Sequence, residues 1–335
     1  MIKGNQSFIF ESKPVIISSA TIAGPFEGEG PLAKDIDVIH EDVYLGQDSF
    51  EKAERMMLEQ AAMKALEKAG VSKYDVGMLI CGDLINQIIS SSFAARTMGI
   101  PYLGIYGACS SSMEGLTIAA SFIDGQKVKY VLTGASSHNC CAEKQYRYPT
   151  EYGSQKPPTS QWTVTGAGAC LLASQGVGPK VTSATIGRIV DLGITDPFNM
   201  GAAMAPAAVD TIEAHFRDMN IEPDYYDIIV TGDLGSIGHK IALDKLLENG
   251  IRIPVKIFGD CGMMIYDSKK QPEVLSGGSG CASSAVTVYG HLLNRMRSGE
   301  IKKMLAVATG ALHSPLTYQQ KETIPCIAHA VAIEM

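Results

Sequence analysis

Cys109 is the residue of this chain whose surroundings best suit a nucleophile. It stands in Gly107-Ala108-Cys109-Ser110-Ser111-Ser112, where small residues join an apolar segment to a helix-like one. A thiol on the first turn of a buried helix lies against unpaired backbone N–H groups and the positive end of the helix dipole, which lowers its pKa. The same geometry binds the carboxylate of a ligand without any chemistry. Whether Cys109 reacts therefore depends on the partners that a nucleophile needs elsewhere in the chain.

The composition indicates a folded protein with a large core. The chain has 335 residues, of which 46% are hydrophobic, enough for one large domain or two of ordinary size. A formal net charge of −7 without a basic cluster argues against nucleic acid as a partner. No apolar run reaches the roughly 18 residues of a membrane span, and the N-terminus lacks a secretion pattern. We expect a protein that is not secreted, with any membrane role peripheral.

The eight cysteines are scattered and form no CxxC pair. This spacing signals neither a zinc site nor a redox dithiol, so we expect no metal site and no cofactor. In a reducing compartment most of these thiols are small core residues.

Several elements recur in the same order in the two halves of the chain. An apolar run ending in Gly-Asp-Leu appears twice, and so does a cysteine followed by small residues at a helix start. The matching segments are 78–84 with 228–234, 109–112 with 281–284, and 128–135 with 303–311. Apolar runs without alternation suit sheets that helices cover on both faces. The repeat predicts a duplicated α/β fold with halves at residues 1–175 and 176–335.

Two local predictions concern a helix and a loop. Asp48 is expected to cap a helix that has Glu51 three positions on and ends at Gly70. Residues 139–161 contain three prolines and read as a long loop inserted in the first half. This loop is either an insertion that contacts a second copy of the chain or a lid over a pocket.

Five segments, in this order, give the chain its resemblance to the thiolase superfamily, and most of all to the ketoacyl-carrier-protein synthase III branch. They are the helix end at Ala69-Gly70, the strand end at Gly82, and residues 107–111, 163–172 and 277–284. The resemblance implies a five-layered α/β/α/β/α fold from two duplicated halves, in a homodimer. It also implies that Cys109 stands at the position of an acylated nucleophile, which uses a histidine and an asparagine as partners.

Both partners differ in this chain. Gly232 stands at the position of the family's histidine, and Ser279 stands at the position of its asparagine. His239 lies about two helical turns beyond Gly232, too far to substitute simply. The family's glycine-rich strand end is only partly present, at Gly310, and His313 follows it. Three roles are open for His313: a relocated base, a pocket histidine that pairs with an anionic ligand, or a structural residue.

A thiolase fold that keeps the cysteine and loses its partners is typical of the stage V sporulation protein AD family of spore-forming bacteria. The chain resembles that family throughout, including its segments 24–31, 107–112 and 231–235. The resemblance implies a non-catalytic protein that binds dipicolinic acid, free or as its calcium chelate. It further implies uptake of this ligand into the developing spore, its release at germination, and membrane-embedded stage V sporulation A proteins as partners. The expected location is soluble or peripheral at the inner membrane of the forespore and spore.

Dipicolinate is a flat ring with two carboxylates, so its site needs hydrogen-bond donors and apolar walls. The predicted ligand-binding residues are Cys109, Ser110, Met204, Gly232, Asp233, Ser279, Gly310 and His313, with Met263-Met264 as an alternative wall. Two roles are open for Asp233 and Asp83. Each is expected either to complete the oxygen shell of a calcium ion or to cap the following helix. Two alternatives remain: a condensing enzyme that transfers acyl groups from coenzyme A thioesters through Cys109, and a structural subunit with a vestigial pocket.

Overall fold

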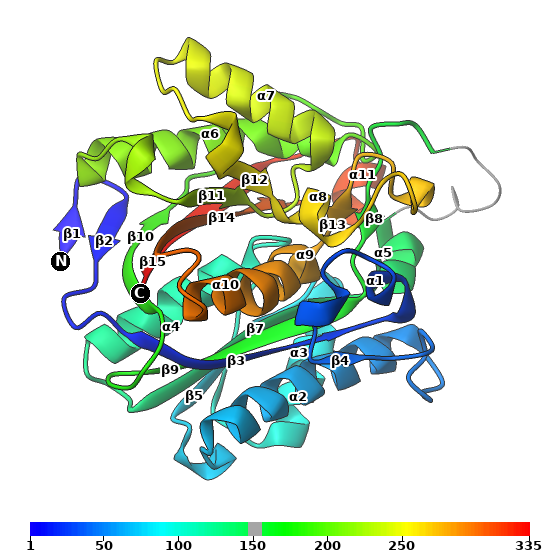
Figure 1. Ribbon diagram of the computed structural model, residues 1–335. Coiled ribbons are helices and arrows are strands. Elements are labelled where there is room, and N and C mark those ends of the chain that lie inside the picture. The colour runs from blue at the N-terminus through cyan, green and yellow to red at the C-terminus, as the bar shows by residue number, and fades with distance from the viewer. Residues whose placement is uncertain (147–155) are drawn as a thin grey trace.

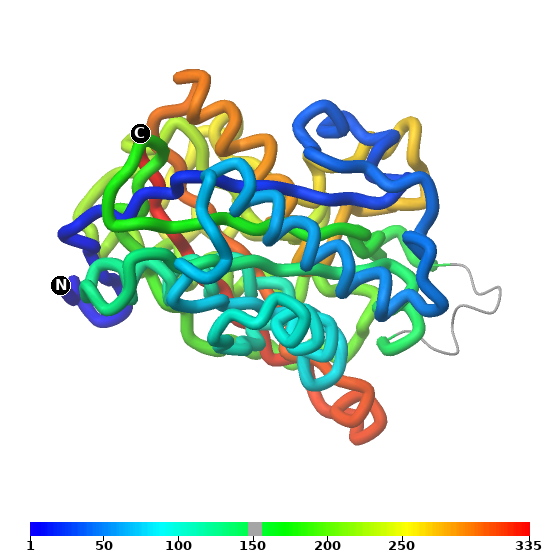
Figure 2. The backbone as a smooth tube through the Cα atoms, turned by 90° about the horizontal axis from the view of Figure 1, so that it is seen from below, coloured from blue at the N-terminus to red at the C-terminus, as the bar shows by residue number. Residues whose placement is uncertain are grey.

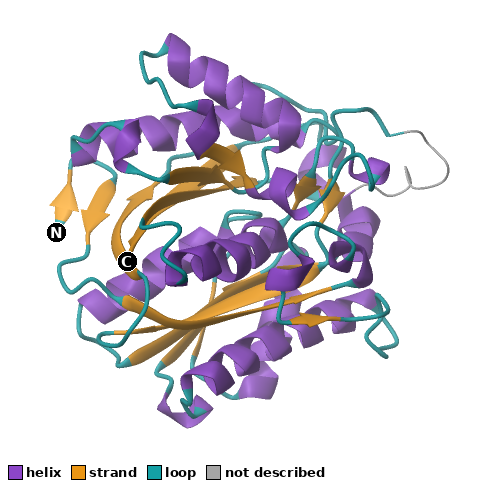
Figure 3. Ribbon diagram, viewed as in Figure 1, coloured by secondary structure: helices purple, strands orange, loops and turns teal. Residues whose placement is uncertain are grey.

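A computed structural model describes residues 1–146 and 156–335. The chain forms five layers, in which two curved sheets alternate with three layers of helices (Figures 1 and 3). This arrangement confirms the predicted α/β/α/β/α fold. None of the helices in the described ranges has the length and apolar character needed to cross a bilayer.

The two sheets have the same strand order. The first runs β3 (Val15–Ala23), β9 (Gly166–Ala173), β7 (Tyr130–Ser137), β5 (Met78–Gly82) and β6 (Tyr102–Gly104). The second runs β10 (Lys180–Ile186), β15 (Cys326–Glu334), β14 (Lys303–Ala311), β11 (Ile228–Thr231) and β12 (Phe258–Asp260). One pairing, Lys180 with Val15, joins them at the β10–β3 edge. Because each strand of the first sheet has a counterpart in the second, the repeat seen in the sequence is a duplication of the whole layer.

The helices fill the space between the sheets and cover their outer faces. The central layer contains α4 (Ser111–Asp124), α9 (Cys281–Val286), a π-helical turn (Thr287–Leu292) and α10 (Leu293–Arg297). The outer layers are α2 (Phe50–Ala69) with α3 (Ile89–Met98), and α6 (Met200–Met219) with α7 (Gly235–Glu248). Helix α4 contacts strands of both sheets and is therefore held from two sides.

Shorter elements complete the chain. They are β1 (Ile2–Lys3), β2 (Ser7–Ile9), α1 (Pro25–Gly28), β4 (Val38–Ile39), α5 (Asn139–Tyr146), β8 (Trp162–Thr163), α8 (Cys261–Ile265), β13 (Gly278–Ser279) and α11 (Pro315–Gln319). Helix α11 and its neighbouring turn project from the body of the molecule in Figure 2. Strand β2 pairs with β10 of the second sheet, although the predicted boundary places it in the first half. The division at residue 175 stays a prediction.

Two local details differ from the sequence-based expectations. Ser49, not Asp48, caps α2 by accepting the N–H of Lys52, while Asp48 forms an ion pair with the Lys52 side chain. The helix ends as predicted, at Gly70 in the left-handed conformation. Residues 139–146 form helix α5 instead of a loop. The rest of the predicted loop includes residues 147–155, which lie outside the described residues.

Candidate functional site

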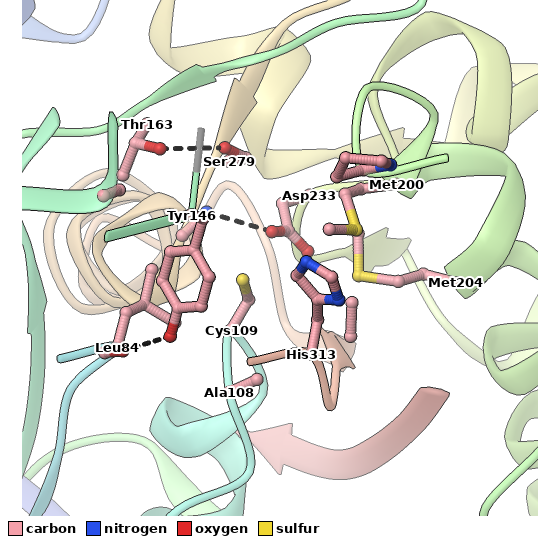
Figure 4. A pocket seen from close by; sticks show the side chains of 14 residues that line it. Leu84, Ala108, Cys109, Tyr146, Thr163, Met200, Met204, Asp233, Ser279 and His313 are labelled. Atoms are coloured by element: carbon pink, nitrogen blue, oxygen red, sulfur yellow. Dashed lines mark hydrogen bonds between the residues drawn. The ribbon is translucent and has the colours of Figure 1, made fainter. Parts of the chain in front are cut away.

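A cavity opens between the two halves, at the carboxyl ends of β5, β11 and β14 (Figure 4). Its empty volume, with the mouth included, is about 550 Å³. The described residues that line it are mostly apolar, with a few polar groups: Leu84, Ala108, Cys109, Ala142, Tyr146, Thr163, Pro197, Met200, Met204, Asp233, Ser279, Gly280, Ala311 and His313. This mixture of apolar walls and a few polar groups is typical of a small-molecule site.

The turn that carries Cys109 is held by its own serines. Ser110 Oγ donates to the Gly107 carbonyl at 2.6 Å, and Ser111 Oγ donates to the Ala108 carbonyl at 2.7 Å. Ala108 has a φ of 49°, a left-handed conformation that is strained for a residue with a side chain. Helix α4 begins only at Ser111, so Cys109 precedes the first turn on which we expected it.

Asp233 lies just after β11, and its carboxylate is fully buried beside the thiol. It accepts hydrogen bonds from Thr309 Oγ1 at 2.7 Å and from the Gly280 N–H at 3.0 Å. Asp233 does not cap α7. Asp260 does so instead, by accepting the N–H groups of Leu234 and Gly235. Asp233 is therefore free of the capping role and faces the cavity (Figure 4).

The electrostatics of this pair contradict the predicted thiolate. Burial raises the pKa of the Cys109 thiol well above its ordinary value, and the neighbouring Asp233 carboxylate raises it further. Burial also raises the pKa of Asp233 to about 7, against the opposing effect of its hydrogen bonds. The expected lowering of the Cys109 pKa was wrong, because the desolvation of the charged form outweighs what the backbone donors offer.

His313 and Tyr146 lie on opposite sides of Cys109 in Figure 4. His313 follows β14 and is 4% exposed, with its ring near that of Tyr318 on α11. Tyr146 is the last residue of α5, and its hydroxyl donates to the Leu84 carbonyl. The cavity thus takes one aromatic side chain from each half of the chain.

Ser279 reaches the cavity from the short β13, which pairs in parallel with β8. Its Oγ lies 3.4 Å from Thr163 Oγ1 on β8. The Gln161 side chain fixes this corner by donating to the carbonyls of Asp233 and Gly278. Two hydroxyls therefore line the wall where the resemblance to the synthases leads one to expect an amide.

Three predicted ligand-binding residues do not line the cavity. The Ser110 hydroxyl is used inside its own turn. At Gly310, a Cβ would lie 2.1 Å from the Gly107 carbonyl oxygen, so this glycine lets β14 approach the Cys109 turn. At Gly232, a Cβ would lie 3.1 Å from the backbone of Ala308 and Thr309. These residues shape the site from behind, whereas Cys109, Met204, Asp233, Ser279 and His313 line it.

Some lining residues were missed from the sequence. Met200 lies one helical turn before Met204 on α6, and this spacing could have revealed it. Leu84 ends the Gly-Asp-Leu segment of the first repeat. The matching segment of the second repeat contains Asp233, so the repeat could have revealed Leu84. Ala142 and Tyr146 carried no signal because their segment read as a loop. Neither Met263 nor Met264 lines the cavity.

The acidic residues offer little for a resident metal ion. Asp83 accepts hydrogen bonds from the N–H groups of Ile85 and Ser91. It therefore caps α3, which is one of the two roles predicted for it. Among residues 1–146 and 156–335, no cluster of three or more His, Cys, Asp or Glu side chains is placed to hold a metal.

Comparisons with known proteins identify the family. A family model described as stage V sporulation protein AD matches residues 4–334. The stage V sporulation protein AD of Bacillus subtilis (strain 168) is 47% identical over 333 residues, which are 99% of this chain and 98% of that protein.

Solved structures show the same fold at low identity. The 3-oxoacyl-(acyl-carrier-protein) synthase III of Aquifex aeolicus has a TM-score of 0.59 and 14% identity, over 96% of this chain and all of that one. Cerulenin-bound OleA of Xanthomonas campestris has a TM-score of 0.64 and 15% identity, over 98% of this chain and all of that one. The chain has a thiolase-like fold and belongs to the stage V sporulation protein AD family.

Proposed function

We propose that this protein binds dipicolinic acid in the Cys109 cavity without chemical conversion, and that it takes part in the uptake of this ligand into the spore and its release at germination. The observation that carries the proposal is the pairing of Cys109 with Asp233. A condensing enzyme needs a thiolate and a base that assists it. Here the buried carboxyl group of Asp233 lies beside the thiol of Cys109 and raises the thiol pKa, which opposes formation of the thiolate.

The charges around the cavity favour a ligand without net charge. The described lining residues include one carboxyl group, that of Asp233, and neither lysine nor arginine. A bare dianion would lose its hydration without gaining a cation. The calcium chelate is neutral, and the Asp233 carboxylate offers an oxygen to the calcium that the ligand brings. We therefore expect calcium to arrive as part of the cargo.

The apolar walls suit the ring of this ligand. Leu84, Met200 and Met204 surround the polar floor, and Ser279 and Thr163 offer hydroxyl groups to a carboxylate. Such a site orients a flat ring by its faces and fixes its direction by a few hydrogen bonds.

The assembly around the protein is also a proposal. We propose a homodimer formed through the open edge of β6, where Leu103 and Tyr106 are exposed beside Phe93 of α3. Membrane-embedded stage V sporulation A proteins would pass the ligand to or from the cavity, with this chain soluble or peripheral at the inner membrane of the forespore and spore.

Calorimetry tests the binding function. The wild-type protein is titrated with dipicolinate in the presence of calcium and again in the presence of a calcium chelator. We expect saturable binding that is tighter with calcium. Met204→Lys, which places a charged chain in the cavity, is expected to abolish binding, whereas Met263→Lys outside the cavity is the matched control. No heat and no thermal shift in the wild type would favour a structural subunit with a vestigial pocket.

His313 supports one alternative, because it brings an imidazole to the same cavity as Cys109 (Figure 4). In that case the protein transfers acyl groups from coenzyme A thioesters. Intact-mass analysis after incubation with acetyl-, malonyl- and longer acyl-coenzyme A distinguishes the two functions. Stable acylation of Cys109 in the wild type, absent from Cys109→Ala, would overturn the binding-only proposal.

A further inference from the structure

Two aromatic rings face the space above Cys109. The ring centroids of Tyr146 and His313 are 6.1 Å apart, and their planes differ by 33°. The two residues come from different halves of the chain, and both line the cavity (Figure 4). We call the pair of rings with the space at their faces the aromatic slot.

Each ring is supported from outside the cavity. The Tyr146 hydroxyl donates to the Leu84 carbonyl, which also accepts the Gln145 side chain at 3.0 Å. On the other side, the ring of Tyr318 packs edge-on against His313 with centroids 5.9 Å apart. These contacts favour the observed orientations before a ligand arrives, so the pair is partly preorganised, and the Tyr146 ring is the one that has to move.

The dimensions of the slot fit a flat ring after a small movement. A planar ring between two others needs about 7 Å, two contacts of about 3.5 Å. The observed 6.1 Å therefore has to widen by about 1 Å. Tyr146 is the terminal residue of α5, where a change of side-chain torsion moves the ring without displacing a strand.

We propose that Tyr146 and His313 hold the aromatic ring of the ligand between their faces and thereby determine its specificity for a planar aromatic dicarboxylate. This inference rests on the proposed function of the same cavity. In this arrangement one edge of the ligand points at Asp233 and Cys109 on the floor. A saturated or open-chain dicarboxylate with the same donor atoms fits the floor and loses the contacts with both rings.

The test compares dipicolinate with piperidine-2,6-dicarboxylate, which has the same skeleton but a saturated, non-planar ring. Both are titrated calorimetrically in excess calcium. We expect the wild type to bind dipicolinate at least tenfold more tightly. Tyr146→Leu is expected to weaken dipicolinate binding about tenfold and to leave the saturated analogue within about twofold. Tyr146→Phe keeps the ring and is expected to retain the preference, as is Tyr44→Leu, a control at an exposed tyrosine outside the cavity.

A spectroscopic measurement separates ring contact from a merely structural effect. The proton resonances of dipicolinate are expected to shift upfield on binding to the wild type, because they lie over aromatic faces, and to lose most of this shift in Tyr146→Leu. Equal affinity of the wild type for both ligands, or an unchanged shift in a folded Tyr146→Leu protein, overturns the slot while dipicolinate binding stands. Absence of dipicolinate binding in the wild type overturns the proposed function and the slot together.

Discussion

Asp233 is an acidic neighbour of the Cys109 thiol, whereas a nucleophilic thiolate is stabilised by a neighbouring cation such as a protonated histidine. A carboxylate beside a thiolate repels it, and burial penalises both charges. Both effects favour the protonated form of Cys109, as the proposed binding role requires.

Replacing Asp233 by asparagine should make Cys109 more reactive. The amide removes the neighbouring negative charge, so the thiol pKa falls, although burial still holds it above the ordinary value. Peptide mapping after iodoacetamide treatment at a series of pH values measures this effect. We expect alkylation of Cys109 at pH 8 to be several-fold faster in Asp233→Asn. Asp83→Asn removes a buried carboxylate outside the lining and is the matched control; an equal increase there would contradict the account.

Asp233 was among the predicted ligand-binding residues, but its place beside the thiol was not predicted. The resemblance to the synthases pointed to Gly232, which follows β11 directly, whereas the chain presents Asp233. A Cβ at Gly232 would meet Ala308 and Thr309 of β14, whereas Asp233 lines the cavity. A shift of one residue at a strand end changes the face, and the sequence alone does not fix where β11 ends.

At the scale of elements, the site depends on turns that several strands and helices hold together. Asp260 is the last residue of β12 and accepts hydrogen bonds from the N–H groups of Leu234, Gly235 and Met263, which lie at the starts of α7 and α8. It also accepts Thr231 Oγ1 at 2.7 Å. One buried carboxylate thus fixes the segment that carries Asp233.

Asp260→Ala should destabilise the protein and loosen the cavity. The substitution leaves three N–H donors without their acceptor, and we expect a loss of about 2–4 kcal/mol in the free energy of unfolding. Denaturant unfolding measures this loss. Asp48→Ala, which removes an exposed ion pair with Lys52, is the control and should leave stability unchanged. A loss as small as that of the control would show that Asp260 does not organise the site.

The repeat could be predicted because each unit has a strand, a small-residue turn and a helix in a fixed order. Helix α5 could not, because only Cys141 and Ala142 of its residues are buried and it shows no clear apolar periodicity. The cap of α2 was misplaced by one residue because Asp48 and Ser49 are both good capping residues. Tertiary contacts decide between such neighbours.

The whole molecule buries several carboxyl groups, and this should make its stability depend on pH. Glu27 is fully buried, accepts hydrogen bonds from Tyr266 Oη and the Thr165 N–H, and has its pKa raised to about 7 by burial. A raised carboxyl pKa means that the folded state holds a proton that the unfolded state has lost. The contribution of Glu27 is thus complete below pH 4.5 and disappears as the pH rises through 7.

Glu27→Gln should reduce this dependence. The amide keeps the size and one acceptor oxygen but does not titrate. Between pH 4.5 and 7, the free energy of unfolding should therefore fall less steeply in the variant than in the wild type, by up to about 1.4 kcal/mol per pH unit. Urea unfolding across this range provides the measurement, with Glu29→Gln at an exposed neighbouring position as the control. A decline as steep as that of the wild type would contradict a buried, protonated Glu27.

The proposed dimer can be tested at the β6 edge. Leu103→Lys puts a charge on an open strand, which discourages pairing with a second copy. We expect the variant to elute as a monomer with a native circular dichroism spectrum, whereas Leu192→Lys, at an exposed position on the other half, should stay dimeric. Light scattering after size-exclusion chromatography gives the masses. A wild-type monomer, or a Leu103→Lys dimer, would rule out this interface.

The central claim is that the cavity between the two halves holds calcium dipicolinate and leaves it intact. The crystal structure of the protein grown with calcium and dipicolinate tests this claim most directly. We predict density for the planar ligand above Cys109, with its calcium near Asp233, its ring between Tyr146 and His313, and an unmodified thiol. Ligand density at another place on the molecule with this cavity empty, or a covalent adduct on Cys109, would contradict the account.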